Sequence, residues 1–246
     1  MSSILIGLGH KARQGKDITA SMISELYKNV HVAHWADSLY KEVKNEERKY
    51  PLIVRVSNQT DVWYQLLDNA EYGDYLQFKA TEVPQINEIF KERGITSYWG
   101  MDEKDSPILQ FWGTGFRRSL CGEEYWVDKT METIKEIDNR YGNNIEQPAI
   151  ILIPDTRFLN ELSAITRNNG YYIDLVRLNE DGTRFIATDR DPNHASEMGL
   201  DGILSRYGIV AKTGDIDNIK EQVISIMTDI LKEMGKRANI VLEMAA

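Results

Sequence analysis

The sequence predicts an α/β protein whose core is a five-stranded parallel sheet with helices on both faces. Short apolar runs alternate with amphipathic stretches along the chain, which is the pattern of parallel strands joined by helices. The stretch Ile150–Ile153 is apolar at every position, as expected for a central strand that is covered on both faces. Near the N-terminus, a glycine-rich loop joins an apolar run to a helical pattern. Together these observations predict a three-layer fold.

The composition limits the classes of function. The chain has 246 residues, which is enough for one large domain or two small ones, and with 42% hydrophobic residues it can bury a full core. Its net charge of −9 argues against binding to nucleic acid or to an anionic membrane, since both require a basic face. No apolar run approaches the ~18 residues of a membrane span. The absence of a recognisable signal peptide and the single Cys121 predict a cytoplasmic protein, and a homodimer is left open.

Residues 4–20, ILIGLGHKARQGKDITA, read as a strand, a loop and the start of a helix. This order is typical of a phosphate-binding P-loop, in which small residues let backbone N–H groups approach phosphate and the helix N-terminus adds donors. Lys16 would add a full positive charge at the phosphates. Asp17 stands where Ser or Thr usually assists magnesium, and a carboxylate also serves Mg²⁺. The alternative is an ordinary glycine-rich turn before a helix.

The next segment predicts a second strand from Val30 and a helix from near Leu39. In open α/β sheets, ligand groups come from the carboxyl ends of the strands. Asp37, Ser38 and Lys41 are therefore candidate binding residues. For Asp37 the alternative is a plain helix N-cap, which Asp favours in any protein.

Two segments are interpreted as additions to a single domain that spans residues 1–246. Residues 45–105 are charged and rich in aromatic side chains, and we predict a mostly helical insertion there. Residues 179–206, here called the lid segment, are polar, lack apolar periodicity and carry Arg184 and Arg190. A long polar loop in a compact domain is usually functional or disordered, and we expect a lid that brings arginines to phosphate.

A pair of arginines follows a glycine-rich break. We predict a helix around 108–112, then the break Gly113-Thr114-Gly115, and a further helix from about Glu123. Arg117 and Arg118 lie between the break and that helix. Adjacent guanidinium groups could hold a phosphate through bidentate hydrogen bonds. A solvated arginine pair at a helix end is the alternative.

Asp155 lies at the C-terminal tip of the apolar run 150–153, where Pro154 ends the strand. In P-loop enzymes an acid at this position holds magnesium, often through water. Arg157 follows two residues later, and an ion pair between Asp155 and Arg157 is the structural alternative. The remaining strands and the closing amphipathic helix are predicted to begin at Gly170, Tyr207 and Asn218.

Four segments of the chain carry a family resemblance. They are KARQGKDITA from Lys11, WADSLYKEV from Trp35, LQFWGTGFRRSLCGEEYWVDK from Leu109, and PDTRFLNEL from Pro154 together with RDPNHASE from Arg190. They resemble, in this order, the P-loop, the FADxLK segment, the LQxxGTexxR helix pair, and the acid–arginine turn with lid of the phage-type deoxynucleoside monophosphate kinases. These enzymes are a branch of the P-loop nucleoside monophosphate kinases. The resemblance covers about residues 3–44 and 106–232.

The resemblance implies transfer of the γ-phosphate of ATP to a (deoxy)nucleoside 5′-monophosphate with Mg²⁺. For a phage-encoded enzyme it implies the cytoplasm of the host. Lys16 would bind the transferring phosphate, and Asp17 and Asp155 would assist the metal. The residues implied as catalytic are Lys16, Arg118, Arg157, Arg184 and Arg190.

The resemblance also implies two sets of binding residues for small-molecule nucleotides. The ATP set is Gly9, His10, Lys11, Ala12, Arg13, Gln14, Gly15, Lys16, Asp17, Lys212, Thr213, Gly214 and Asp215. The acceptor set is Asp37, Ser38, Lys41, Gln110, Gly113, Thr114, Arg117, Arg118, Trp126, Asp155 and Arg157.

The sequence departs from the family at two positions. His10 replaces the first loop glycine, and Gly115 replaces the usual Glu after Gly-Thr, which bears on recognition of the base or the sugar. Two other functions fit the same residues. One is a P-loop kinase with another acceptor, such as dephospho-coenzyme A or a modified base in DNA, although the acidic charge argues against a DNA polymer. The other is a nucleotide-binding protein without turnover.

Overall fold

The computed structural model describes residues 2–9, 11–44, 52–57, 62–67, 113, 117–118, 121–142, 148–188, 193 and 195–245, and the structural statements below concern these residues. The chain divides into two compact units. Unit 1 contains Met1–Trp35 and Val127–Ala246, and unit 2 contains Ala36–Trp126. Unit 2 is therefore longer than the insertion predicted at residues 45–105. Each unit is described by itself.

Unit 1 is built on a five-stranded parallel sheet, as predicted. The strand order is β2-β5-β1-β6-β7, and every neighbouring pair is parallel. β1 is central, so the loop that follows it emerges at the middle of the sheet's carboxyl edge. The strands are β1 Ile4–Leu8, β2 Val30–Val32, β5 Ile150–Ile153, β6 Tyr171–Leu178 and β7 Tyr207–Lys212.

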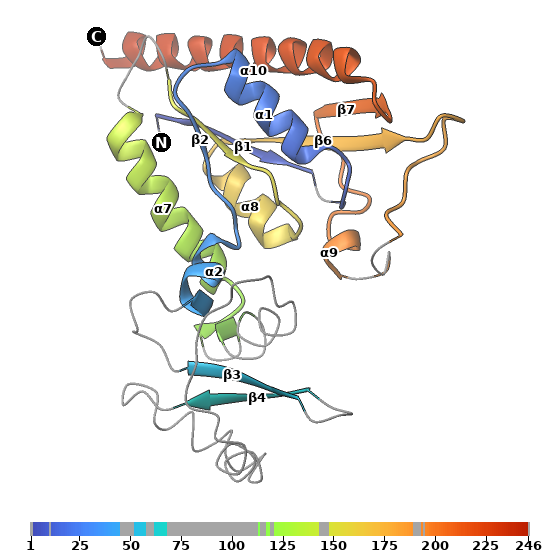
Figure 1. Ribbon diagram of the computed structural model, residues 1–246. Helices are drawn as coiled ribbons and strands as arrows, with labels where there is room; N and C mark the ends of the chain where they lie inside the picture. Colours follow the sequence, from blue (N-terminus) through green and yellow to red (C-terminus); the bar gives the residue numbers. More distant parts are fainter. Residues whose placement is uncertain are drawn as a thin grey trace. The chain divides into compact units, whose positions relative to one another are not determined.

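Helices cover both faces of this sheet. Figure 1 shows α1 and α10 on one side of the strands and α8 on the other. The helix α8 between β5 and β6 was not predicted, yet parallel neighbours need a crossover connection of this kind. The helices of unit 1 are α1 Lys16–Leu26, α8 Leu159–Arg167, α9 Ala195–Met198 and α10 Ile216–Ala245, together with most of α7 Tyr125–Tyr141.

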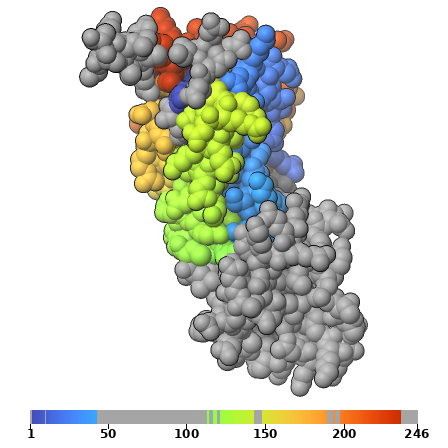
Figure 2. Space-filling view, turned by 90° about the vertical axis from the view of Figure 1, so that its left-hand side faces the viewer, coloured from blue at the N-terminus to red at the C-terminus, as the bar shows by residue number. Residues whose placement is uncertain are grey.

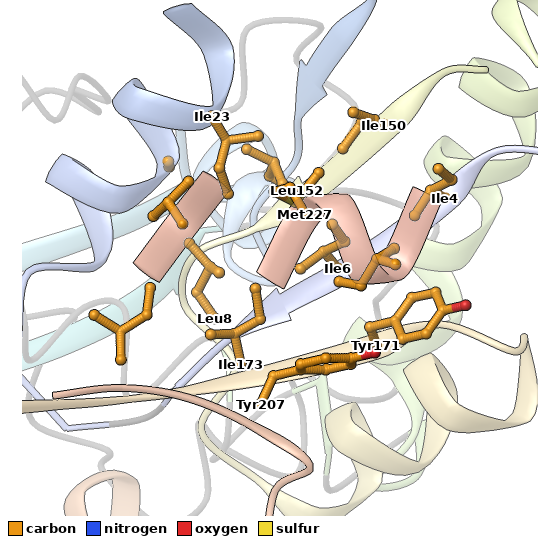
Figure 3. Packing of buried hydrophobic residues seen from close by; sticks show 14 of the residues in the cluster. Ile4, Ile6, Leu8, Ile23, Ile150, Leu152, Tyr171, Ile173, Tyr207 and Met227 are labelled. Atoms are coloured by element: carbon orange, nitrogen blue, oxygen red, sulfur yellow. The ribbon is translucent and has the colours of Figure 1, made fainter. Parts of the chain in front are cut away.

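The two faces of each central strand enter different cores, because successive side chains of a strand point to opposite faces. Ile4, Ile6 and Leu8 pack with Ile23 of α1 and Met227 of α10, as Figure 3 shows. The intervening residues pack on the other face with α7 and α8. That second core contains Leu5, Ile151, Ile153, Trp35, Val127, Met131, Ile134, Ala164 and Ile165. Continuous apolar strands are thus explained by burial on both faces.

α7 is amphipathic and reaches the surface with its polar side. Ile134 is fully buried, whereas Glu132 and Glu136 are exposed. Figure 2 shows this outer side of α7, in green, beside the blue N-terminal residues. Among the residues that the structure describes, no helix is both long and apolar enough to cross a membrane.

Unit 2 contains a pair of strands that we did not predict. Its described elements are α2 Asp37–Lys44 and the antiparallel strands β3 Leu52–Ser57 and β4 Val62–Leu67. The sequences LIVRVS and VWYQLL are rich in β-branched and aromatic residues, which favour a pleated surface over a helix. The predicted helix at 108–112 lies outside the described residues.

Candidate phosphate-binding site

The loop between β1 and α1, residues 9–15 and here called the N-terminal loop, turns directly into a helix. Gly9 donates its N–H to the carbonyl of Ile173 on β6 at 2.8 Å. A Cβ at Gly9 would lie 2.9 Å from the backbone nitrogen of Leu175, so this close approach requires glycine. Gly15 has φ 97°, a left-handed conformation, and α1 begins at the next residue, Lys16. The predicted strand–loop–helix order is confirmed.

Lys16, which follows this loop, is a buried cation with 8% of its surface exposed. Its Nζ donates to the carbonyl oxygen of Lys11 at 2.7 Å, which folds the side chain back along the loop. Burial, and then the positive charge of Arg157, lower the pKa of Lys16 from 10.5 to about 8. Nearby carboxylates oppose this shift; they belong to Glu197, Asp155 and Asp17. Both predicted metal acids are therefore close enough to Lys16 to act on its charge.

The two residues predicted after β5 have separate partners. Asp155 Oδ1 accepts the backbone N–H of Trp35 at 3.2 Å and lies 3.7 Å from Nδ1 of His34. The guanidinium of Arg157 donates to Oε1 of Glu197 at 3.0 Å. The ion pair between Asp155 and Arg157, our structural alternative, is not formed among the described residues. Both side chains thus stay beside Lys16 without neutralising each other.

Glu197, on α9 in the lid segment, was missed by the sequence analysis. Its carboxylate accepts the backbone N–H of Ala12 at 2.9 Å as well as the guanidinium of Arg157. Its backbone carbonyl accepts Nζ of Lys11 at 2.8 Å, and Asp201 also pairs with Lys11. Glu197 is 5% exposed. The lid segment carries six acidic residues, so the sequence alone does not single out Glu197.

Gln14 was predicted to bind ATP as part of the loop, but its side chain has a structural role. It is buried, and its Oε1 accepts the backbone N–H of Arg177 on β6 at 2.7 Å. Its Nε2 donates to the carbonyl of Phe185 at 3.2 Å. Gln14 thereby ties the N-terminal loop to β6 and to the lid segment.

A cavity of about 370 Å³ opens beside the N-terminal loop. It lies between the start of α1, the ends of β6 and β7, and the turn after β7. Arg177, also missed by the sequence analysis, lines it: Nε donates to Oγ1 of Thr213 at 2.8 Å, and the guanidinium stacks 4.1 Å from the ring centre of Phe185. The predicted ATP residues that line the cavity are Arg13, Gln14, Gly15, Lys16, Asp17, Lys212, Thr213 and Gly214.

The side chain of Asp215, another predicted ATP residue, makes a contact at the start of α10. It precedes α10, and its carboxylate accepts the backbone N–H of Asn218 at 3.4 Å. This is the geometry of a helix N-cap, which Asp favours because it satisfies an N–H of the first turn. The placement of Asp215 beside ATP stays a prediction.

In unit 2 the two predicted arginines differ. Arg117 is 4% exposed, and its Nε lies 2.6 Å from Oε2 of Glu42. Tyr125 donates its hydroxyl to Oε1 of the same Glu42 at 2.5 Å, and the guanidinium of Arg117 lies 5.4 Å from the Tyr125 ring centre. Arg118 is half-buried, and its Nε lies 4.0 Å from the exposed carboxylate of Glu123. The alternative of a solvated pair is wrong for Arg117.

The other acceptor candidates in unit 2 are partly structural. Trp126 is buried and donates its indole N–H to the carbonyl of Gly113 at 2.9 Å. α2 begins at Asp37, two residues earlier than predicted, so Asp37 is an acid in the first helical turn, where the helix dipole favours it. Ser38 is half-buried and Lys41 exposed.

Four of the predicted site residues lie outside the described part of the chain: His10, Gln110, Thr114 and Arg190. Arg184 is exposed and forms an isolated bridge with Leu178. It lines a second cavity, of about 320 Å³, together with Lys11, Ala12, Glu197 and Asp201. The lid segment thus brings at least one predicted arginine toward the N-terminal loop.

Comparison with known proteins adds no identification, because no family model matches the sequence and no curated protein matches it. What the structure brings together is a buried lysine at a helix start, Arg157 opposite Glu197, two nearby acids and an adjoining cavity. The function has to be argued from these groups.

Proposed function

We propose that this chain is an ATP-dependent (deoxy)nucleoside monophosphate kinase, which transfers the γ-phosphate of ATP to a nucleoside 5′-monophosphate and yields the diphosphate. The observation that carries the proposal is the position of Lys16. It is buried at the first residue of α1, directly after the left-handed Gly15. The loop before it leaves the carboxyl end of β1, the central strand of the parallel sheet. Backbone N–H groups at such a loop and helix start favour an anion, and Lys16 adds a full charge.

The charges around Lys16 suit phosphoryl transfer. This reaction needs positioning and neutralisation of charge on phosphate oxygens, with little covalent chemistry from the protein. Arg157 lowers the pKa of Lys16, which means that two cations share this region at a cost in free energy. A phosphate bound between them would relieve that cost. We assign Lys16 to the transferring phosphate and Arg157 to the acceptor phosphate.

The cavity of about 370 Å³ offers a place for the nucleoside of ATP. It shares Gly15 and Lys16 with the N-terminal loop and extends to the turn Lys212–Gly214. Ile209, Ala211 and Ile219 supply apolar lining, and Arg177 supplies a planar cation that can stack on a base. A base bound here would place its phosphates toward Lys16.

Asp17 and Asp155 fit a Mg²⁺ ion whose other ligands come from the phosphates of the substrate. Among the described residues, no group of three or more His, Cys, Asp and Glu side chains is arranged to enclose a metal ion. In phosphoryl transfer, however, Mg²⁺ is usually bound by one or two carboxylates together with phosphate oxygens. Asp17 and Asp155 are hard oxygen donors, and both act on the charge of Lys16. Bound there, magnesium would neutralise charge on the phosphates.

An ADP-release assay tests the proposal. The full chain is supplied with ATP, Mg²⁺ and, in turn, each deoxy- and ribonucleoside monophosphate. We expect ADP release with at least one monophosphate, and a loss of several orders of magnitude in Lys16→Ala, consistent with electrostatic contributions of ~3–4 kcal/mol or more. Lys220→Ala, on the exposed side of α10, is the matched control and should retain full turnover.

The same assay distinguishes the alternatives. ADP release that starts with dephospho-coenzyme A but with none of the monophosphates would reassign the acceptor. ATP binding without release in any mixture would mean a nucleotide-binding protein without turnover. Normal release by folded Lys16→Ala would show that the phosphate site lies elsewhere.

A further inference from the structure

The carboxylate of Glu197 occupies two donors that a phosphate would use. One of its oxygens accepts the backbone N–H of Ala12, inside the N-terminal loop, at 2.9 Å. The other accepts the guanidinium of Arg157 at 3.0 Å. A backbone N–H and an arginine together are a common donor set for phosphate oxygens. The carboxylate of Glu197 therefore binds the two donors in the way that a phosphate would bind them.

The burial of Glu197 makes this contact strong. Its side chain is 6% exposed, and a carboxylate removed from water needs charged or hydrogen-bonded partners. Glu197 also acts on Lys16, since it is the largest of the influences that raise the pKa of that residue. Its negative charge thus faces the same cations, Lys16 and Arg157, that we assign to phosphate.

There is room beside Glu197 for a second position of its carboxylate. The cavity of about 320 Å³ is lined by Glu197 itself and by Arg184, an exposed cation of the lid segment. Lys11, which holds the backbone carbonyl of Glu197, lines it too. A rotation of the Glu197 side chain would move its carboxylate from Arg157 into this cavity with little movement of the backbone.

We propose that Glu197 is an internal competitor for the phosphate site: binding of phosphate displaces its carboxylate from Ala12 and Arg157 into the neighbouring cavity and loosens α9 from the N-terminal loop. This regulation rests on the proposed function of the Lys16 site. The competition excludes weakly charged ligands, because a ligand must bring enough negative charge to replace the buried carboxylate of Glu197. A polyphosphate does so, and a neutral nucleoside does not.

Pyrophosphate tests the competition, since it carries the anion chemistry without a base. Calorimetric titration of the full chain is compared with Glu197→Gln, which keeps the shape and removes the charge. If the carboxylate competes, the variant binds pyrophosphate more tightly, by about tenfold, which corresponds to about 1.4 kcal/mol. Glu180→Gln, the same change at an exposed position of the lid segment, is the control and should leave the affinity unchanged.

The direction of the change in pyrophosphate affinity tests the proposal. Weaker binding by Glu197→Gln would mean that the carboxylate positions Arg157 and Ala12 for phosphate, and unchanged binding would mean that it does not share their donors; either result overturns the proposal. Failure of the wild-type chain to release ADP in the kinase assay, with tighter pyrophosphate binding by the variant, would overturn the proposed function and leave the competition standing.

Amide hydrogen exchange of the wild-type chain is a second test of the displacement and needs no variant. The amides of Asp201 and Ile203 are bonded to the carbonyls of Met198 and Leu200, in and just after α9. If phosphate releases Glu197, these amides exchange faster when pyrophosphate is added. Slower exchange would show that phosphate fastens α9 to the loop, which contradicts the displacement.

Discussion

At the scale of single residues, Lys16 carries the most information about function. Its pKa of about 8 reflects burial and the neighbouring Arg157, which both disfavour the charged form. A lysine in water remains charged far above pH 8, so the fold destabilises the charged form of Lys16 at the start of α1. An anion that binds beside Lys16 stabilises its charged form and raises its pKa again.

The affinity for ATP should therefore depend on pH in a defined window. Below pH 8 Lys16 is already protonated, and binding is strongest. Above pH 8 the protein must take up a proton to bind, so affinity falls by at most roughly tenfold per pH unit. Dissociation constants measured at pH 7 and pH 9.5 would show the loss.

Lys16→Arg is the control for this pH dependence, because a guanidinium stays charged throughout the range. Its affinity should be nearly the same at both pH values. Equal affinities of the wild-type chain at pH 7 and pH 9.5 would contradict the assignment of Lys16 to the phosphates.

Arg117 and Arg118 are adjacent in sequence but should respond differently to substitution. Arg117→Ala leaves the buried carboxylate of Glu42 without its ion-pair partner, and breaking a buried pair costs about 3–5 kcal/mol. Arg118→Lys should fold normally and raise the KM for the monophosphate far more than the KM for ATP, because an ammonium cannot reproduce a bidentate guanidinium contact. Urea unfolding and initial-rate kinetics measure the two effects.

A stable Arg117→Ala would mean that Glu42 finds another partner. If Arg118→Lys raises the KM for ATP more than the KM for the monophosphate, the assignment of Arg118 to the acceptor is wrong.

At the scale of elements, the N-terminal loop is defined by its contacts with β6. Gly9 donates to Ile173, and Gln14 accepts from Arg177, so the two ends of the loop are held by the same strand. The loop conformation therefore depends on a strand that lies more than a hundred residues later in the sequence. Neither contact follows from the local pattern of glycines.

Gly9→Ala tests this arrangement. The new Cβ would lie 2.8 Å from Oδ1 of Asp174 and 2.9 Å from the backbone nitrogen of Leu175, so the loop must shift. We expect a loss of about 1–3 kcal/mol in unfolding free energy and weaker ATP binding, as for other overpacked sites.

Gly208→Ala on β7 is the matched control, since the nearest atom to its Cβ would be the Asp174 carbonyl oxygen at 3.9 Å. It should fold at least as stably as the wild type and bind ATP normally. Equal behaviour of the two variants would show that the Gly9 backbone does not approach β6 closely in solution.

At the scale of the whole molecule, binding at the Lys16 site should stabilise the fold. A ligand present at a hundred times its dissociation constant adds about 2.7 kcal/mol to the unfolding free energy of a protein that it binds only when folded. For a chain of this size, that shifts Tm by roughly 5–10 °C. We expect such a shift for ATP with Mg²⁺, measured by scanning calorimetry.

Lys16→Ala should lose most of this shift, while Lys220→Ala should keep it. A similar shift in both variants would place the nucleotide away from Lys16.

Much of the architecture could be read from local patterns. β1, β5, β6 and β7 were predicted within a few residues, because apolar runs of strand length have few other ways to become buried. The loop and the helix start at Lys16 followed from the glycines that come after β1. The antiparallel strands β3 and β4 lie within residues 45–105, for which the sequence analysis predicts a mostly helical insertion, although both strands are rich in β-branched and aromatic residues.

The sequence by itself determined which residues form the strands of the parallel sheet, where the N-terminal loop turns into α1, and that the chain carries Lys16, Asp155 and Arg157 at strand and helix ends. The tertiary structure alone decided their partners. Glu197, Arg177 and Glu42 gained their roles because the strand order β2-β5-β1-β6-β7 and the helix packing bring distant segments together. Periodicity reports which face of an element is buried, whereas a hydrogen bond or an ion pair depends on the path of the whole chain.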